Sequence, residues 1–183
     1  DVSGTDNDAN GNTGYGFNAL DAITTGDYNT AIGDQAGTNI NGGNANTLVG
    51  KDAGDSLTSG SNNIAIGFDS LQNEDTGNNN IAIGRQALFT QNYDGDAYNI
   101  AIGHQAGFAV STGTKNILVG GLAGDALTTG EYNIAIGHNS LSAEDTGTRN
   151  VAIGFEALRD LNYDGTGYNT AIGWQTGLSL TTG

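Results

Sequence analysis

A five-residue motif that starts with Asn, ends with Gly and carries aliphatic or small residues between them occurs nine times in the chain. NIAIG appears four times, and NTAIG, NTLVG, NILVG and NVAIG supply the other copies. Successive motifs are separated by 17, 17, 17, 19, 17, 17, 17 and 19 residues, and a degenerate copy, NTGYG, precedes them at 12–16. Such a fixed short period predicts a solenoid of stacked coils.

A second level of repetition groups the coils in fours. Residues 27–96 align with 97–166 without a gap and agree at 40 of 70 positions, and a third copy begins at residue 167. The chain therefore divides into a lead-in segment, 1–11, and a repeat array, 12–183. Because the final LTTG also occurs at 127–130, where another coil follows it, we expect further coils beyond residue 183.

Each motif has the alternation of a β-strand, with Ile64 and Ile66 on one face and Ala65 on the other. A second apolar stretch follows, as in QAGTNI (35–40), before a TTG-type turn. Seventeen residues accommodate two short strands and two turns. We therefore predict an all-β, parallel β-solenoid of about ten coils, roughly 48 Å long at about 4.8 Å per coil. The 19-residue coils are expected to place their two extra residues in loops at 91–96 and 161–166.

Stacking identical coils aligns equivalent residues into columns, and two columns are expected to stabilise the stack. The first is an interior ladder of aliphatic residues: Ile32, Val49, Ile66, Ile83, Ile102, Val119, Ile136, Ile153 and Ile172. The second is a ladder of side-chain amides that bond from coil to coil: Asn29, Asn46, Asn63, Asn80, Asn99, Asn116, Asn133, Asn150 and Asn169.

The motif pattern N-x-A-I-G-x-x-A/S resembles the head repeat of YadA-like trimeric autotransporter adhesins, and also the NTAIG arrays of phage tail-fibre and related surface-fibre proteins. The resemblance covers 12–183 and implies a left-handed roll with three chains side by side. Glycines such as Gly67 would then allow close approach of a neighbouring chain, and the residues at the centre of each strand would form the seam between chains: Ala31, Leu48, Ala65, Ala82, Ala101, Leu118, Ala135, Ala152 and Ala171. Leu48 and Leu118 depart from the alanine pattern, so they would either fill the trimer axis or be exposed.

The position after each motif glycine varies most, which predicts a solvent-facing column. Its aromatic and charged residues are candidates for receptor or glycan recognition, and unconstrained drift at a surface position is the alternative. The tyrosines of the two long loops are further candidates, because loops on rigid scaffolds commonly carry function. Together these receptor-facing candidates are Phe68, Tyr93, His104, His138, Phe155, Tyr163 and Trp174.

The segment DNDANG (6–11) matches the opening of a calcium loop, in which Asp6, Asp8 and Asn10 would supply oxygen ligands. The position where such a loop places its glutamate holds Phe17 instead. Calcium binding is therefore a possibility that the motif supports only in part, and no cofactor is otherwise required.

Composition narrows the function further. Twenty acidic against five basic residues, a formal charge of −15, disfavour nucleic acid as a partner. The chain lacks cysteine and an apolar run long enough to cross a membrane. We expect a non-enzymatic, extracellular or virion-borne fibre segment that forms a homotrimer and presents binding surface, as tail fibres and adhesins do. The alternative is a filament or surface-layer subunit whose copies stack end to end.

Overall fold

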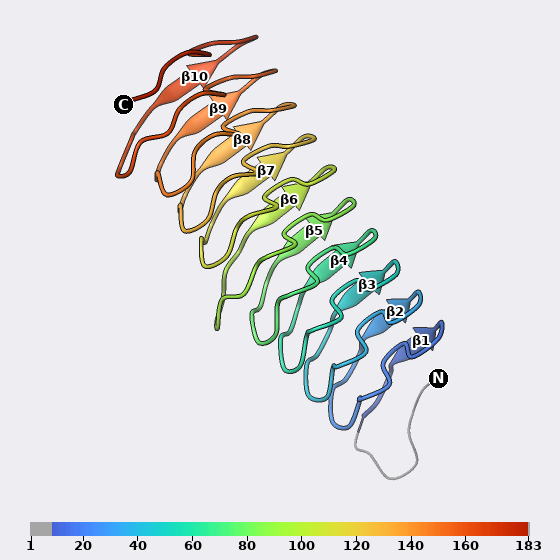
Figure 1. Cartoon of the computed structure of the whole chain (residues 1–183). Helices are drawn as coiled ribbons and strands as arrows, with labels where there is room; N and C mark the ends of the chain where they lie inside the picture. The colour runs from blue at the N-terminus through green and yellow to red at the C-terminus, as the bar shows by residue number, and fades with distance from the viewer. Residues whose placement is uncertain (1–8, 183) are drawn as a thin grey trace.

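The computed structural model describes residues 9–182 and shows a β-solenoid (Figure 1). Ten strands of three residues form one parallel sheet in chain order, and each strand pairs with the strands of the adjacent coils. No helix occurs within residues 9–182. The strands are β1 (Thr13–Tyr15), β2 (Thr30–Ile32), β3 (Thr47–Val49), β4 (Ile64–Ile66), β5 (Ile81–Ile83), β6 (Ile100–Ile102), β7 (Ile117–Val119), β8 (Ile134–Ile136), β9 (Val151–Ile153) and β10 (Thr170–Ile172).

The pairing register places each motif residue on its equivalent in the next coil. Ala31 pairs with Leu48, Leu48 with Ala65, and Ala65 with Ala82. The sequence period is therefore the stacking period, which confirms the predicted parallel β-solenoid.

Each coil contains one regular strand, so the predicted second strand is absent from residues 9–182. The residues after the motif glycine form turns instead. Positions two, four and twelve residues after that glycine have positive φ in the 17-residue coils, for example Asp52 (55°), Leu71 (49°) and Asn62 (59°). Residues in this left-handed region cannot continue a strand, which requires extended backbone on both sides. The second apolar stretch therefore bends around the core rather than running along it.

The asparagine ladder is confirmed. The backbone N–H of Asn63 donates to Asn46 Oδ1 (2.9 Å), and Asn63 Nδ2 donates to the carbonyl of Gly77 (2.8 Å). Asn116 and Asn133 repeat this pattern. The ladder side chains from Asn29 to Asn150 are at most 1% exposed. In this pattern one amide satisfies buried backbone groups of two coils at once. Asn80 is an exception, because its Nδ2 has no hydrogen-bond partner.

Each motif glycine from Gly16 to Gly154 lies against the backbone of the next coil. A Cβ on Gly50 would come within 3.0 Å of the Gly67 backbone in the next coil, and Gly50 has φ of 137°. Gly67 has the same relation to Gly84. The close neighbour of this column is thus the next coil of the same chain, which corrects the expectation of a neighbouring chain.

The two faces of the strands are the reverse of those predicted. The expected seam residues are interior: Ala31, Leu48, Ala65, Ala82, Ala101, Leu118, Ala135, Ala152 and Ala171 are at most 4% exposed. The expected interior ladder lies outside, because none of Ile32, Val49, Ile66, Ile83, Ile102, Val119, Ile136, Ile153 and Ile172 is buried. Strand alternation separates two faces without stating which is inside. The narrow coil admits the smaller residues.

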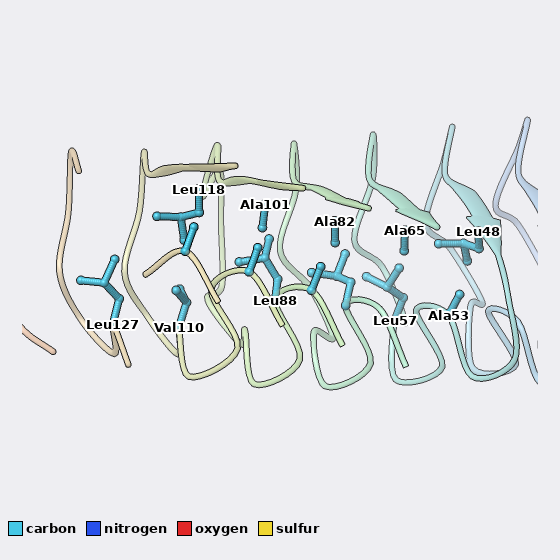
Figure 2. Packing of buried hydrophobic residues seen from close by; sticks show 14 of the residues in the cluster. Leu48, Ala53, Leu57, Ala65, Ala82, Leu88, Ala101, Val110, Leu118 and Leu127 are labelled. Atoms are coloured by element: carbon cyan, nitrogen blue, oxygen red, sulfur yellow. The ribbon is translucent and has the colours of Figure 1, made fainter. Parts of the chain in front are cut away.

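Leu48 and Leu118 are the two large residues in a column of interior strand residues that otherwise holds alanine in β2–β10 (Figure 2). A Cβ on Gly37 or Gly54 would approach Leu48 within 3.0 Å, so Leu48 occupies the space that these glycines leave. Gly107 and Gly124 leave the same space for Leu118. In the intervening coils the central strand residues are alanines, and the glycine position holds buried leucines: Leu20, Leu71, Leu88, Leu141 and Leu158. This exchange of large and small residues is one cause of the 70-residue super-repeat.

We predict that Leu48→Ala lowers the free energy of unfolding by about 2–5 kcal/mol, because it leaves a cavity in a fully buried layer. Adding Gly54→Leu should recover part of the loss, because it recreates the arrangement of buried Leu158, which has Ala152 and Ala171 in the strands on either side and Leu161 three positions later. Leu57 Cδ1, which would lie 2.9 Å from the new Cβ, must shift to admit it. Urea unfolding followed by circular dichroism measures both effects. The control is Leu48→Ala with Gly124→Leu, where the leucine meets Leu118 and should add its own cost. Equal stability of the two double variants would contradict the proposed complementarity.

Candidate functional site

The outer face of the sheet, formed by the first and third residues of each strand, carries an aliphatic strip whose side chains are exposed or half-buried. Its third column is Ile or Val in β2–β10, and Ile32, Ile66 and Ile136 are 41%, 36% and 37% exposed. The first column is Ile or Val from β4 to β9. The strip is about 38 Å long and about 12 Å wide, on the order of 450 Å², a size at which surface patches are commonly functional. We call it the sheet face.

Two columns of exposed or half-buried residues flank each strand. The leading column is the residue before each ladder asparagine, from Tyr28 to Tyr168, and the trailing column is the residue after each motif glycine, from Asp34 to Trp174. Leading and trailing residues of one coil are six positions apart. The sheet face therefore has one column of residues along each of its two edges.

The trailing column forms stacked groups. The rings of His138 and Phe155 stack with centroids 5.7 Å apart, and those of Phe155 and Trp174 stack at 4.2 Å. The Arg85 guanidinium lies 5.9 Å from the Phe68 ring centroid, and its Nη1 lies 3.2 Å from His104 Nε2. Gly121 interrupts the column between His104 and His138. These contacts bring five of the sequence-predicted recognition residues into one column.

Stacking changes what these rings can offer a ligand. Phe155 has a ring on both faces, so its edge rather than its face is available to a ligand. Recognition of a glycan by stacking on an aromatic face therefore has little room in the middle of this group.

The leading column places cations against tyrosine rings. Lys115 Nζ lies 4.9 Å from the Tyr132 ring centroid and 2.9 Å from Tyr132 Oη. The Arg149 guanidinium lies 5.0 Å from the same ring and 5.9 Å from that of Tyr168. Cation–π contacts of this kind are weakly attractive at exposed sites.

The edges of the sheet face hold most of the positive charge of this acidic chain. Four of the five basic residues lie in the two columns: Lys51, Arg85, Lys115 and Arg149. Lys51 also pairs with Asp52 (2.8 Å) and Asp34 (3.5 Å). Exposed pairs of this kind contribute little to stability. The composition of the edges, rich in Tyr, Phe, Trp and Arg around an aliphatic centre, is typical of protein–protein interfaces.

The two predicted loop tyrosines lie elsewhere, and each is held by a buried glutamate that sequence reasoning missed. Glu74 accepts hydrogen bonds from the backbone N–H groups of Gly77 (2.8 Å) and Tyr93 (3.3 Å). Glu144 does the same for Gly147 (2.8 Å) and Tyr163 (3.2 Å). Both glutamates are 0% exposed, whereas the tyrosines are 36% and 38% exposed. Glu74 occupies the interior position that Leu57 holds in the preceding coil, and Glu144 the position that Leu127 holds. Alignment of the coils could therefore have indicated from the sequence that both glutamates are buried.

Burial sets the protonation of these groups. Loss of solvation raises the pKa of Glu74 and of Glu144 above the usual value of 4.5, and the backbone donors offset part of the shift. Burial likewise raises the pKa of Asp55 and of Asp125.

The calcium hypothesis falls mainly outside the described residues, because Asp6 and Asp8 lie there. Of the three expected ligands, Asn10 is described, and its backbone N–H donates to Asp27 Oδ1 (2.7 Å). Within residues 9–182, no group of three or more His, Asp or Glu side chains is arranged to hold a metal ion. The same range contains no helix long and apolar enough to span a bilayer.

The chain matches no protein-family model, no curated protein and no solved structure. The assignment of the solenoid fold therefore rests on the structure alone, and the relationship to tail fibres and adhesin heads stays a prediction.

We predict that the protein becomes more stable as the pH falls from about 7 toward the unfolded glutamate pKa of 4.5. A carboxyl whose pKa is raised in the folded state binds more protons folded than unfolded, so its stabilising contribution is lost as pH rises through the folded pKa. Glu74→Gln should reduce this pH dependence, because it removes one such carboxyl. The melting temperature measured at several pH values tests this.

Asp21→Asn is the matched control, because it removes one exposed negative charge and leaves the buried carboxyls in place. An equal pH dependence of the melting temperature in Glu74→Gln and Asp21→Asn would contradict the assignment of this dependence to the buried glutamate.

Proposed function

We propose that this chain is a non-enzymatic segment of an extracellular or virion-borne fibre, and that three copies pack side by side through their sheet faces. The observation that carries the proposal is the aliphatic strip of exposed and half-buried side chains, which runs through nine coils without interruption in its third column. Burial of such a strip is favourable in proportion to its apolar area.

A second copy of the same chain fits this strip by its period. The aliphatic side chains repeat at the strand spacing of about 4.8 Å over about 38 Å, so the best partner surface has that spacing and length. An identical copy aligned in parallel supplies both. The homotrimer, rather than another number of copies, follows the resemblance of the motif to trimeric fibre repeats.

The biological role follows from shape. A rod whose coils repeat one structural unit gives length and stiffness, which suits a shaft or head that projects from a surface. Tyr93 and Tyr163 lie in loops outside the sheet face, so lateral packing leaves these loops as candidate contacts for a cell-surface receptor or glycan. Tail fibres and adhesins both work in this way.

We predict that Ile66→Glu with Ile136→Glu converts the trimer to monomers that remain folded. Both side chains are exposed in the single chain, so the charges cost little there, but they would be buried without partners in the assembly. Sedimentation gives the mass, expected at three times 18.6 kDa before the change and at 18.6 kDa after it. Circular dichroism confirms that the coils persist.

The control, Ser59→Glu with Thr129→Glu, adds the same charges at exposed turns away from the sheet face and should leave the mass unchanged. A monomeric wild-type segment would overturn the proposal. Polymers that grow with concentration and ignore the isoleucine changes would favour the end-to-end filament instead.

A further inference from the structure

We infer that neighbouring copies meet edge to edge in one register, with the leading column of one copy against the trailing column of the next at the same coil. This inference rests on the proposed lateral assembly and adds its register and polarity. It makes the interface heterologous, because each copy offers one edge to one neighbour and the other edge to the second neighbour.

Symmetry and pitch favour this register. Rotation about an axis parallel to the rods keeps every coil at its own height. Six of the 17 residues of a coil separate the leading from the trailing residue, so the chain rises about 1.7 Å between them at about 4.8 Å per coil. The trailing residue of the same coil on a neighbour is therefore about 1.7 Å away in height, against about 3.1 Å for that of the preceding coil.

The residues on the two edges are complementary in this register. Lys115 faces Gly121, the one position of the trailing column without a side chain in the described coils, and Lys51 faces Ala45. Arg149 faces Phe155, and Tyr28 faces Asp34. In no pair do two basic residues meet. The nine pairs are Tyr28–Asp34, Ala45–Lys51, Asn62–Phe68, Asn79–Arg85, Tyr98–His104, Lys115–Gly121, Tyr132–His138, Arg149–Phe155 and Tyr168–Trp174.

Shifted registers lose this match. A shift of one coil toward the N-terminus places Lys115 against His104 and Arg149 against His138. A shift toward the C-terminus places Lys115 against His138. Each shift brings a lysine onto an imidazole and leaves Gly121 opposite a tyrosine. The gap at Gly121 and the cation at Lys115 thus identify the register.

The absence of cysteine from the chain allows a direct test by cross-linking. The variant Lys115→Cys with Gly121→Cys is treated with a mild oxidant and with a short bifunctional thiol reagent. Gly121 is not in the left-handed region, and a Cβ there makes an ordinary 3.4 Å contact with His138 Cδ2, so cysteine fits. We expect covalent trimers as the main product on a denaturing gel.

Two double variants report the shifted registers: Lys115→Cys with His104→Cys, and Lys115→Cys with His138→Cys. Each single variant controls for contact between like edges and should give no cross-linked species. More efficient cross-linking of either shifted pair would overturn the inferred register. A trimer by sedimentation in which none of the pairs cross-links would overturn the edge-to-edge contact.

The sedimentation mass of each variant, measured before cross-linking, separates the two proposals. A monomer at that stage would mean that the lateral assembly itself fails. A trimer with the wrong cross-linking pattern would leave the assembly standing and reject its register alone.

Discussion

The hydrogen bonds between asparagines of adjacent coils are the interaction on which this fold depends. In Asn63, Asn116 and Asn133 the side-chain nitrogen donates to a turn carbonyl and the side-chain oxygen accepts a hydrogen bond from the backbone N–H of the next asparagine. These side chains are buried, so one residue type satisfies polar groups that would otherwise be unpaired. The adjacent glycine column allows the coils to approach closely enough for those bonds. Together they explain why Asn and Gly bracket the motif, while the residues between them vary with their surroundings.

The period and the strand pattern were sufficient to predict the stacking, the register and the asparagine ladder. They could not predict which strand face is inside, because Ile64, Ala65 and Ile66 alternate equally well in either direction. That choice depends on the opposite wall of the coil. There Leu71 and Leu88 stand across from alanines, and Gly37 and Gly54 stand across from Leu48. The match between distant columns becomes visible only once the coils are aligned in space.

The candidate interaction surface was predictable in part. Variation after the motif glycine indicated an exposed column, but the stacking of His138 on Phe155 and of Phe155 on Trp174 depends on side-chain orientation, which a sequence does not give. The glutamates behind the loop tyrosines were missed because a charged residue type alone is typical of a surface position. When the coils are aligned, Glu74 falls in the same interior column as Leu57, and this position identifies it as buried.

The central claim is that the rods associate through their sides, by the sheet face that the inverted strands leave exposed. Small-angle X-ray scattering of the intact segment measures the length and the cross-section of the particle together. The account predicts a particle about 48 Å long, the length of one stack of ten coils, with the cross-section of three rods. The cross-section of a single rod, or a particle that lengthens as concentration rises, would contradict it.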